Sequence, residues 1–209
     1  LVSFFFTTFV SSKTIWPEVK SIVQKDPIVE KQILTILSKM SLEEKVGQMV
    51  QAEIKHATPE DVKNYHLGSI LNGGGSFPNN NKYADLSEWV KLADSYYNAS
   101  TNRKNVAVAI PVMWGTDAVH GHNNVYGATI FPHNIGLGAA NNPALMNKIG
   151  QATALEVLAT GIDWIFAPTV AVVRNDKWGR TYEGYSESPA IVKSYAGPIV
   201  KGLQGDSQD

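Results

Sequence analysis

The sequence predicts an α/β protein whose parallel sheet forms part of a (β/α)8 TIM-like barrel, incomplete at its C-terminus. Segments that resemble buried strands alternate with segments of helical periodicity, which is typical of parallel βαβ units. No Gly-x-Gly-x-x-Gly turn follows the early strands, so an open dinucleotide-binding sheet is disfavoured. Polar residues collect in loops after the strand ends, where barrels of this type carry their active sites.

Six segments are expected to form helices, because each combines apolar residues at helical spacing with a start signal. The signals are Pro in the first turn or a capping residue such as Ser41, which opens the capping box SLEE. The expected helices cover residues 26–40, 41–50, 58–66, 85–97, 142–158 and 189–203. The fourth helix begins at residue 85 or 87, and its apolar face is predicted to contain Leu86, Trp89, Val90, Ala93, Tyr96 and Tyr97.

Three apolar runs are expected to form buried strands, at residues 68–71, 105–114 and 162–167. The second run, NVAVAIPVMW, is almost continuously apolar, as in a strand covered on both faces. The triplet at residues 73–75 is Gly-Gly-Gly without the Lys-Ser/Thr of a phosphate-binding loop, which favours a simple backbone turn. Only four or five strands can be placed, whereas a complete barrel needs on the order of 250 residues.

The composition excludes several classes of partner. The 209 residues are 44% hydrophobic and 18% charged, with a formal net charge of −1. No run of Lys and Arg could follow a phosphate backbone, so nucleic acid is not an expected partner. The absence of Cys removes disulfides, thiolate metal sites and a Cys nucleophile.

The first twelve residues are interpreted as the remnant of a secretory signal peptide. Residues 1–10, LVSFFFTTFV, are apolar but too short to span a membrane as a helix, and small residues lead to a cleavage site near Ser12. A buried first strand is the alternative. We therefore expect a secreted or periplasmic protein, with a signal remnant at 1–12, a lead-in helix in 13–40 and the barrel domain in 41–209. The missing initiator Met and the abrupt end after the last helix lead us to expect truncation at both ends.

Asp117 follows the second predicted strand and is therefore a candidate ligand-binding residue. A carboxylate at a strand end can accept charge-assisted hydrogen bonds from two adjacent hydroxyl groups. The alternative is that Asp117 caps the following turn through backbone amides.

His120 and His122 raise the question of a metal site, because paired imidazoles at a strand end occur in metal-dependent hydrolases. No acidic ligand lies close by in the sequence, and His133 as a third ligand would be a guess. Histidines that orient Asp117 or hold the loop are favoured, so no metal and no cofactor is expected.

The loop at residues 174–189 is dense in aromatic, guanidinium and carboxylate groups, the set with which proteins bind carbohydrates. The other interpretation is a packed loop in which Arg180 pairs with Glu183 or Glu187 and Trp178 is partly buried. Both can hold together, because a rigid loop is what a positioned Arg needs.

Two long segments resemble glycoside hydrolase family 3. WGRTYEGYSESP is similar to the signature loop of that family, and GTDAVHGHNNVYGATIFPHNIGLGA is similar to its strand-end segment, in the branch with plant β-glucan exohydrolases. The resemblance extends from about residue 41, including SLEEKVGQMV, to residue 203. It implies a (β/α)8-like first domain followed by an α/β sandwich, with glucose bound between them.

By this resemblance, Asp117 and Arg180 would bind hydroxyl groups of the terminal glucosyl unit, with Trp178, His120 and Glu183 as supporting residues. The implied activity is retaining hydrolysis of terminal non-reducing β-D-glucosyl residues from β-glucans or β-glucosides. The family's nucleophilic Asp and acid/base Glu match no position here, so both are expected beyond Asp209, and the 209 residues alone are expected to be inactive.

Two other functions stay open at this point. The first is a non-catalytic sugar-binding module that uses Asp117, Arg180 and Trp178 for recognition. The second is a metal-dependent hydrolase that uses His120 and His122.

Overall fold

The computed structural model describes residues 24–102 and 108–205 and divides the chain into two units. The first unit is Leu1–Ser38 and the second is Lys39–Asp209. Helix α1 (Pro27–Lys39) ends at the boundary and confirms the first expected helix. The proposed signal remnant lies outside the described residues. No helix in the described ranges has both the length and the apolar composition of a membrane span.

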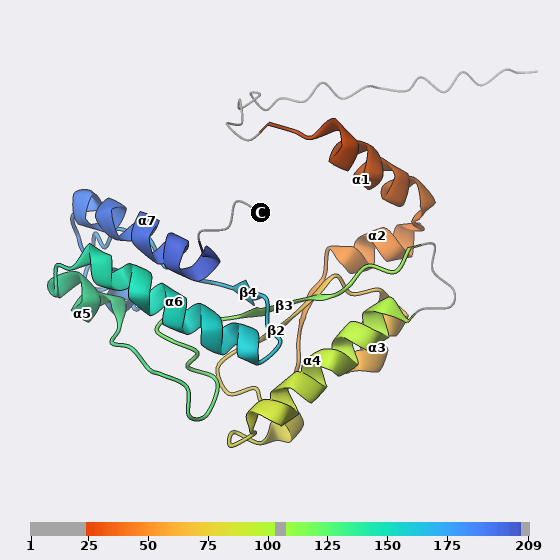
Figure 1. Cartoon of the computed structure of the whole chain (residues 1–209), viewed down its shortest axis with the longest axis horizontal. Helices are drawn as coiled ribbons and strands as arrows, with labels where there is room; N and C mark the ends of the chain where they lie inside the picture. Colours follow the sequence, from red (N-terminus) through yellow and green to blue (C-terminus); the bar gives the residue numbers. More distant parts are fainter. Residues whose placement is uncertain (1–23, 103–107, 206–209) are drawn as a thin grey trace, which may run out of the picture. The chain divides into compact units, whose positions relative to one another are not determined.

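The second unit contains a four-stranded parallel sheet (Figure 1) in which neighbours in sequence are neighbours in space. Strand β1 pairs with β2, β2 with β3, and β3 with β4. The strands are β1 (Gln51–Glu53), β2 (Ser69–Asn72), β3 (Met113–Thr116) and β4 (Trp164–Ile165). The predicted α/β class with a parallel sheet is therefore confirmed.

Five of the six predicted helices lie in this unit, close to their expected limits. They are α2 (Leu42–Gln48), α3 (Pro59–Tyr65), α4 (Leu86–Thr101), α6 (Pro143–Ala159) and α7 (Pro189–Gln204). No sequence pattern indicated β1 or α5 (Asn134–Ala139), a short helix without a side-chain cap. Two short 3-10 helices complete the unit in its described part, η1 (Pro78–Asn80) and η2 (Thr181–Glu183).

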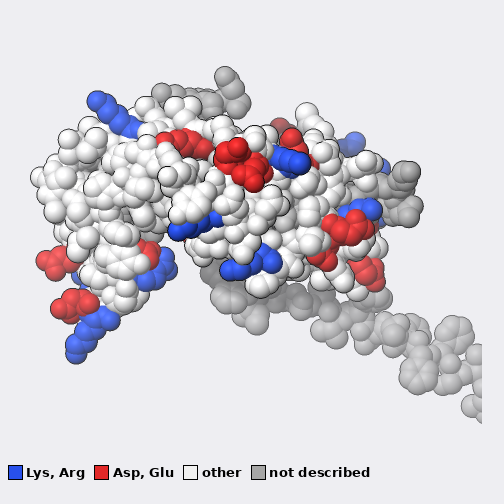
Figure 2. All heavy atoms as spheres, turned by 90° about the horizontal axis from the view of Figure 1, so that it is seen from below, with Lys and Arg blue, Asp and Glu red and all other residues white. Residues whose placement is uncertain are grey.

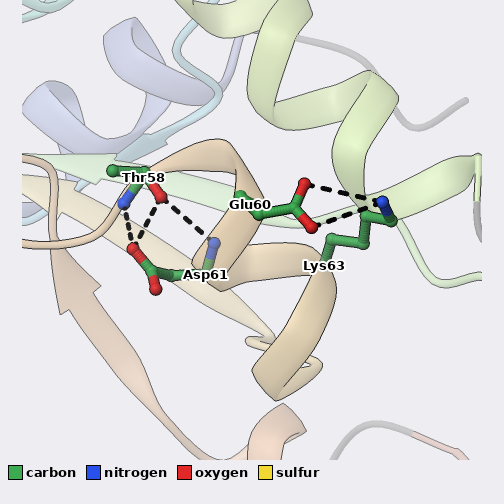
Figure 3. Close-up of polar contacts among 4 residues, drawn as sticks. All are labelled: Thr58, Glu60, Asp61 and Lys63. Carbon is green, nitrogen blue, oxygen red and sulfur yellow. Dashed lines mark hydrogen bonds and ion pairs between the residues drawn. The ribbon is translucent and has the colours of Figure 1, made fainter.

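Local hydrogen bonds explain why the helix starts agree with the sequence. In α3, the Thr58 hydroxyl accepts from the Asp61 amide at 3.2 Å, while the Asp61 carboxylate accepts from the Thr58 amide at 2.8 Å (Figure 3). Ser41 and Asp85 form the same reciprocal pairs at the starts of α2 and α4. Each box satisfies backbone donors that the first helical turn leaves unpaired.

The prediction of a strand over residues 105–114 is wrong for most of its described part. Residues 108–112 form no strand, and β3 begins only at Met113. Pro111 has no amide hydrogen to donate to a ladder, and the Val112 amide donates to the Ser100 hydroxyl of α4 at 3.0 Å. The strand predicted over 162–167 is likewise reduced to Trp164–Ile165.

Within the described residues, helices cover only one face of the sheet, which corrects the prediction of burial on both. Ile70 of β2 and Trp114 of β3 lie in a core formed with α3, α4 and α6. Side chains alternate along a strand, so Met113 belongs to the opposite face, where it is 51% exposed. Trp164 pairs in register with Gly115 on that same face and is 40% exposed.

The predicted apolar face of α4 is only partly right. Trp89 and Tyr96 are almost fully buried and pack against Trp114, with ring centroids 6.1 Å and 5.6 Å from its own. Leu86 and Val90, which were expected on this face, are exposed, as is Tyr97. The buried stripe runs through Trp89, Tyr96 and Ser100, and the other residues lie beside it.

A second core joins α5, α6 and α7. Tyr195 of α7 is fully buried and its hydroxyl donates to the Leu137 carbonyl of α5 at 2.9 Å. The same hydroxyl accepts from the Asn142 amide at 2.7 Å. The Tyr185 ring lies 4.9 Å from that of Tyr195, so the loop after η2 is packed into this core.

Replacing Trp89 by Ala should lower the free energy of unfolding by about 3–5 kcal/mol, because the cavity would lie between α4 and β3. Val90→Ala is the matched control on the same helix, and we expect a loss below about 1 kcal/mol there. Urea unfolding followed by circular dichroism measures both. Equal losses would contradict the assigned packing of α4.

Candidate functional site

Asp117 lies at the carboxyl edge of the sheet, directly after Thr116, the last residue of β3. Thr116 is fully buried, and its hydroxyl accepts from the Asn124 side-chain amide at 3.3 Å. The Asn123 amide, oriented to satisfy its donors, contacts the carbonyls of Gly121 and Asp117. These bonds fix the backbone of the loop, while the Asp117 side chain is exposed and shows no hydrogen bond within the described residues.

His122 belongs to the core under this loop. It is fully buried, its Nε2 lies 3.0 Å from the Thr160 hydroxyl, and its ring packs near Trp89 of α4. The Thr160 hydroxyl donates its own hydrogen to the Val157 carbonyl, so it must accept from His122, which places the imidazole hydrogen on Nε2. Burial lowers the pKa of His122 to about 4, so the ring is neutral near pH 7.

His120 points to different neighbours. Its ring lies 4.4 Å from that of His133, and the His133 ring contacts Tyr182 edge-on at 4.7 Å. Burial, followed by the adjacent His133, lowers the pKa of His120. His120 and His122 thus do not converge on one point, and no group of three or more His, Asp or Glu suited to a metal occurs in residues 24–102 and 108–205.

Arg180 is held by Glu183 in the loop after β4. Its Nε donates to Glu183 Oε1 at 2.9 Å and its Nη2 to Oε2 at 2.5 Å, a two-bond contact across η2. The Glu183 hydrogen bonds raise the pKa of Arg180, and the Arg180 bonds lower the pKa of Glu183. Because 62% of the Arg180 side chain is exposed, the pair adds little to stability; its importance is orientation.

The rest of this loop is ordered by its own side chains. The Thr181 hydroxyl lies 2.7 Å from the Trp178 carbonyl and 3.3 Å from the Asn175 carbonyl. Trp178 is 39% exposed, so its ring is available to a ligand. The structure thus shows the expected Arg180 pair, with Glu183 as the partner, whereas Trp178 is exposed rather than partly buried.

Asp117 and Arg180 come from two different loops, and the Asp117 carboxylate acts electrostatically on the Arg180 guanidinium. Asp117 contributes in the same direction as Glu183 to the raised pKa of Arg180, although its effect is smaller. The two loops thus present an exposed carboxylate, an oriented guanidinium and an indole. The carboxylate can accept hydrogen bonds from a polyhydroxylated ligand, and the guanidinium can donate them. The indole can contact an apolar ring face of the same ligand.

Sequence reasoning missed two residues whose side chains hold loops beyond the strand ends. Glu53 at the end of β1 accepts from the Lys55 amide at 2.6 Å and the Gly73 amide at 3.4 Å, which ties the ends of β1 and β2 together. Asn134 of α5 donates to the Glu183 carbonyl at 2.8 Å. Neither β1 nor α5 had a sequence signal, so neither contact could be anticipated.

Figure 2 shows the distribution of charged side chains over one face of the molecule. Acidic and basic side chains are interspersed there among uncharged ones. A cavity of about 520 Å³ borders the loop that carries Arg180. Its lining includes Arg174, Asp176, Ser186 and Glu187. Neither Asp117 nor Arg180 lines this cavity.

Comparison with known proteins decides the family. The sequence model of the glycosyl hydrolase family 3 N-terminal domain matches residues 41–208. The chain belongs to glycosyl hydrolase family 3. The resemblance seen in the two long motifs is thereby confirmed.

Several relatives are similar over most of this chain. A crystal structure of an exo-1,3/1,4-β-glucanase from a Pseudoalteromonas species is 56% identical with a TM-score of 0.85, covering 94% of this chain and 24% of that one. A lysosomal β-glucosidase of Dictyostelium discoideum is 32% identical over 81% of this chain and 22% of its own length. A periplasmic β-glucosidase of Salmonella typhimurium is 27% identical over 84% and 21%. The chain thus spans about a fifth of the length of these curated relatives.

The stability of this glycosyl hydrolase family 3 chain should depend on pH through His122. Above the ordinary pKa of 6.5 the ring is neutral in both the folded and unfolded states. Below it the unfolded chain binds a proton that the folded chain does not, so stability is lost as the pH falls from about 6.5 to about 4. The difference between these two pKa values lowers the free energy of unfolding by roughly 3 kcal/mol at pH 4, compared with pH 7.

His122→Gln should remove this component, so that its free energy of unfolding, although lower overall, falls less than the wild type between pH 7 and pH 4. The exposed His56→Asn is the matched control and should follow the wild type. Urea unfolding at several pH values gives both slopes. Parallel curves for wild type and His122→Gln would refute the assignment of a neutral buried imidazole.

Proposed function

We propose that this chain is the substrate-binding part of a retaining, exo-acting glycoside hydrolase that removes terminal non-reducing β-D-glucosyl residues from β-glucans or β-glucosides. The observation that carries the proposal is an Arg180 held by Glu183 through two bonds, together with an exposed Asp117 carboxylate on a different loop that acts on it electrostatically. The 56% identity to an exo-1,3/1,4-β-glucanase supports this substrate class.

In this proposal, Asp117 accepts hydrogen bonds from two neighbouring hydroxyls of the glucosyl unit and Arg180 donates to hydroxyls of the same ring. Both bonds would strengthen as the ring distorts toward an oxocarbenium-like transition state, which is how binding groups accelerate the reaction. Trp178 and His120 would support the site, Trp178 by its exposed ring and His120 through its loop. The two carboxyl groups of a retaining mechanism, which lie roughly 5 Å apart, are assigned to no residue of this chain.

We further propose that the sheet is part of a (β/α)8 barrel wall, with the domain at residues 41–209, a lead-in helix within 13–40 and a signal remnant at 1–12. The sequential strand order supports the barrel, because a doubly wound sheet reverses its order at a switch point. The uncovered face with Met113 and Trp164 also fits, since the inner face of a barrel strand packs against other strands.

The proposed compartment is the exterior of the cell or the periplasm. The apolar segment at residues 1–10 is the basis for this in the sequence. The Salmonella typhimurium relative, whose name describes it as periplasmic, supports it.

A β-glucosidase from Listeria innocua is 25% identical over 85% of this chain, with a TM-score of 0.64. A mutant of it has been crystallised with laminaribiose, which is consistent with a β-glucan substrate here.

Arg180→Ala and Asp117→Asn in the intact gene product should each lower kcat/KM for 4-nitrophenyl β-D-glucopyranoside by about 10- to 100-fold, the effect of losing hydrogen bonds to a charged group. Lys193→Ala, an exposed charge on α7, is the control and should retain wild-type activity. Initial-rate kinetics measure all three.

Wild-type rates in both variants would contradict the assigned binding roles. Glucose binding without turnover by the intact protein would favour the non-catalytic sugar-binding module instead. Turnover by the 209-residue chain alone would contradict the placement of both catalytic carboxyls outside it.

A further inference from the structure

The start of α5 lies between the two loops that carry Asp117 and Arg180. The His133 ring contacts His120, three residues after Asp117, at 4.4 Å and Tyr182, two residues after Arg180, at 4.7 Å. The next residue, Asn134, is only 4% exposed. Two consecutive side chains therefore connect segments that are far apart in the sequence.

Asn134 acts on the Arg180 loop through a single hydrogen bond. Its Nδ2 donates to the main-chain carbonyl of Glu183 at 2.8 Å. The carboxylate of that same Glu183 accepts both hydrogen bonds from Arg180. The bond therefore fixes the backbone from which the partner of the guanidinium projects.

The backbone of α5 also packs directly against this loop. A Cβ atom added at Gly138 would collide with the Tyr185 carbonyl oxygen, so no side chain fits between them. Asn134 and Gly138 thus hold the segment on both sides of Gly184. The loop has little freedom to move away from α5 while Asn134 keeps its bond.

We propose that Asn134 is a positioning residue for Arg180, acting through Glu183, and that His133 keeps the Asp117 loop aligned with it. The proposal rests on the proposed function, in which Arg180 holds hydroxyls of the substrate. Asn134 contacts the Glu183 backbone and is assigned no contact with substrate. If Asn134 had a purely structural role, its replacement would affect Arg180 no more than the replacement of another Asn whose side chain donates to a carbonyl.

Asn147 provides that comparison in the same chain. Its Nδ2 donates to the Pro198 carbonyl at 3.3 Å, between α6 and α7 and away from the Arg180 loop. Asn147→Ala therefore removes the same kind of bond as Asn134→Ala, together with the bond that Asn147 Oδ1 accepts from the exposed Gln151 side chain at 3.0 Å. Asn134→Ser, which keeps a polar group too short to reach Glu183, is a second variant in case the Ala variant does not fold.

The first experiment is independent of activity. Nitrogen-15 NMR of arginine Nε–H groups is practical because the chain has only three arginines, and Arg180→Ala identifies the signal of Arg180. We expect the Arg180 Nε–H to exchange with water at least about tenfold faster in Asn134→Ala and Asn134→Ser, as in Glu183→Gln. Asn147→Ala should leave it unchanged. An Arg180 signal unaffected in both Asn134 variants would overturn the proposal.

The second experiment uses kinetics of the intact gene product. Asn134→Ala should lower kcat/KM for 4-nitrophenyl β-D-glucopyranoside by about 10- to 100-fold, as expected for a displaced binding group, and Asn147→Ala should not. In an Arg180→Ala background the same change should cost less than about twofold further, because residues that act through one another are not additive. Additive losses would overturn the coupling. An intact wild type without glucosidase activity would count against the proposed function alone, because the NMR result still decides the position of Arg180.

Discussion

The anchoring of Trp114 fixes where β3 ends, and the two loops of the candidate site depend on that point. Its indole Nε1 donates to the Asn72 side chain of β2 at 2.8 Å, while Trp89 and Tyr96 of α4 pack against the ring. A one-residue slip of β3 would turn this indole to the uncovered face of the sheet. It would also displace Asp117, three residues further on, from its place at the carboxyl edge.

The parts of the fold that the sequence predicted are those determined by local interactions. Ser41, Thr58 and Asp85 cap helices through partners three residues away, and each start was predicted or bracketed correctly. The limits of the strands depend on distant partners instead. The apolar run before Met113 looked like a strand, but the Val112 amide is bound by Ser100 of α4.

The candidate site shows the same division. The Arg180–Glu183 contact spans three residues, and the sequence already offered it as one of two pairings. The Asn134–Glu183 bond spans 49 residues and depends on α5, a helix with two glycines and no capping side chain, so no local pattern indicated it. The burial of His122 beneath the Asp117 loop could not be predicted from the sequence either. It depends on Trp89 of α4 and on Thr160 at the end of α6, which are both distant in the sequence.

The two-bond contact between Arg180 and Glu183 has a consequence for the thermodynamics of ligand binding. A free Arg side chain loses rotamer freedom when a ligand immobilises it, a penalty of about 0.5–1.5 kcal/mol that weakens association. Here the fork geometry of the guanidinium restricts those rotamers when the chain folds, before any ligand binds. The remaining N–H groups then form a preorganised donor array. Under the proposed function, discrimination between sugar epimers would arise mainly from the geometry of their hydroxyl groups rather than from adaptation of the protein.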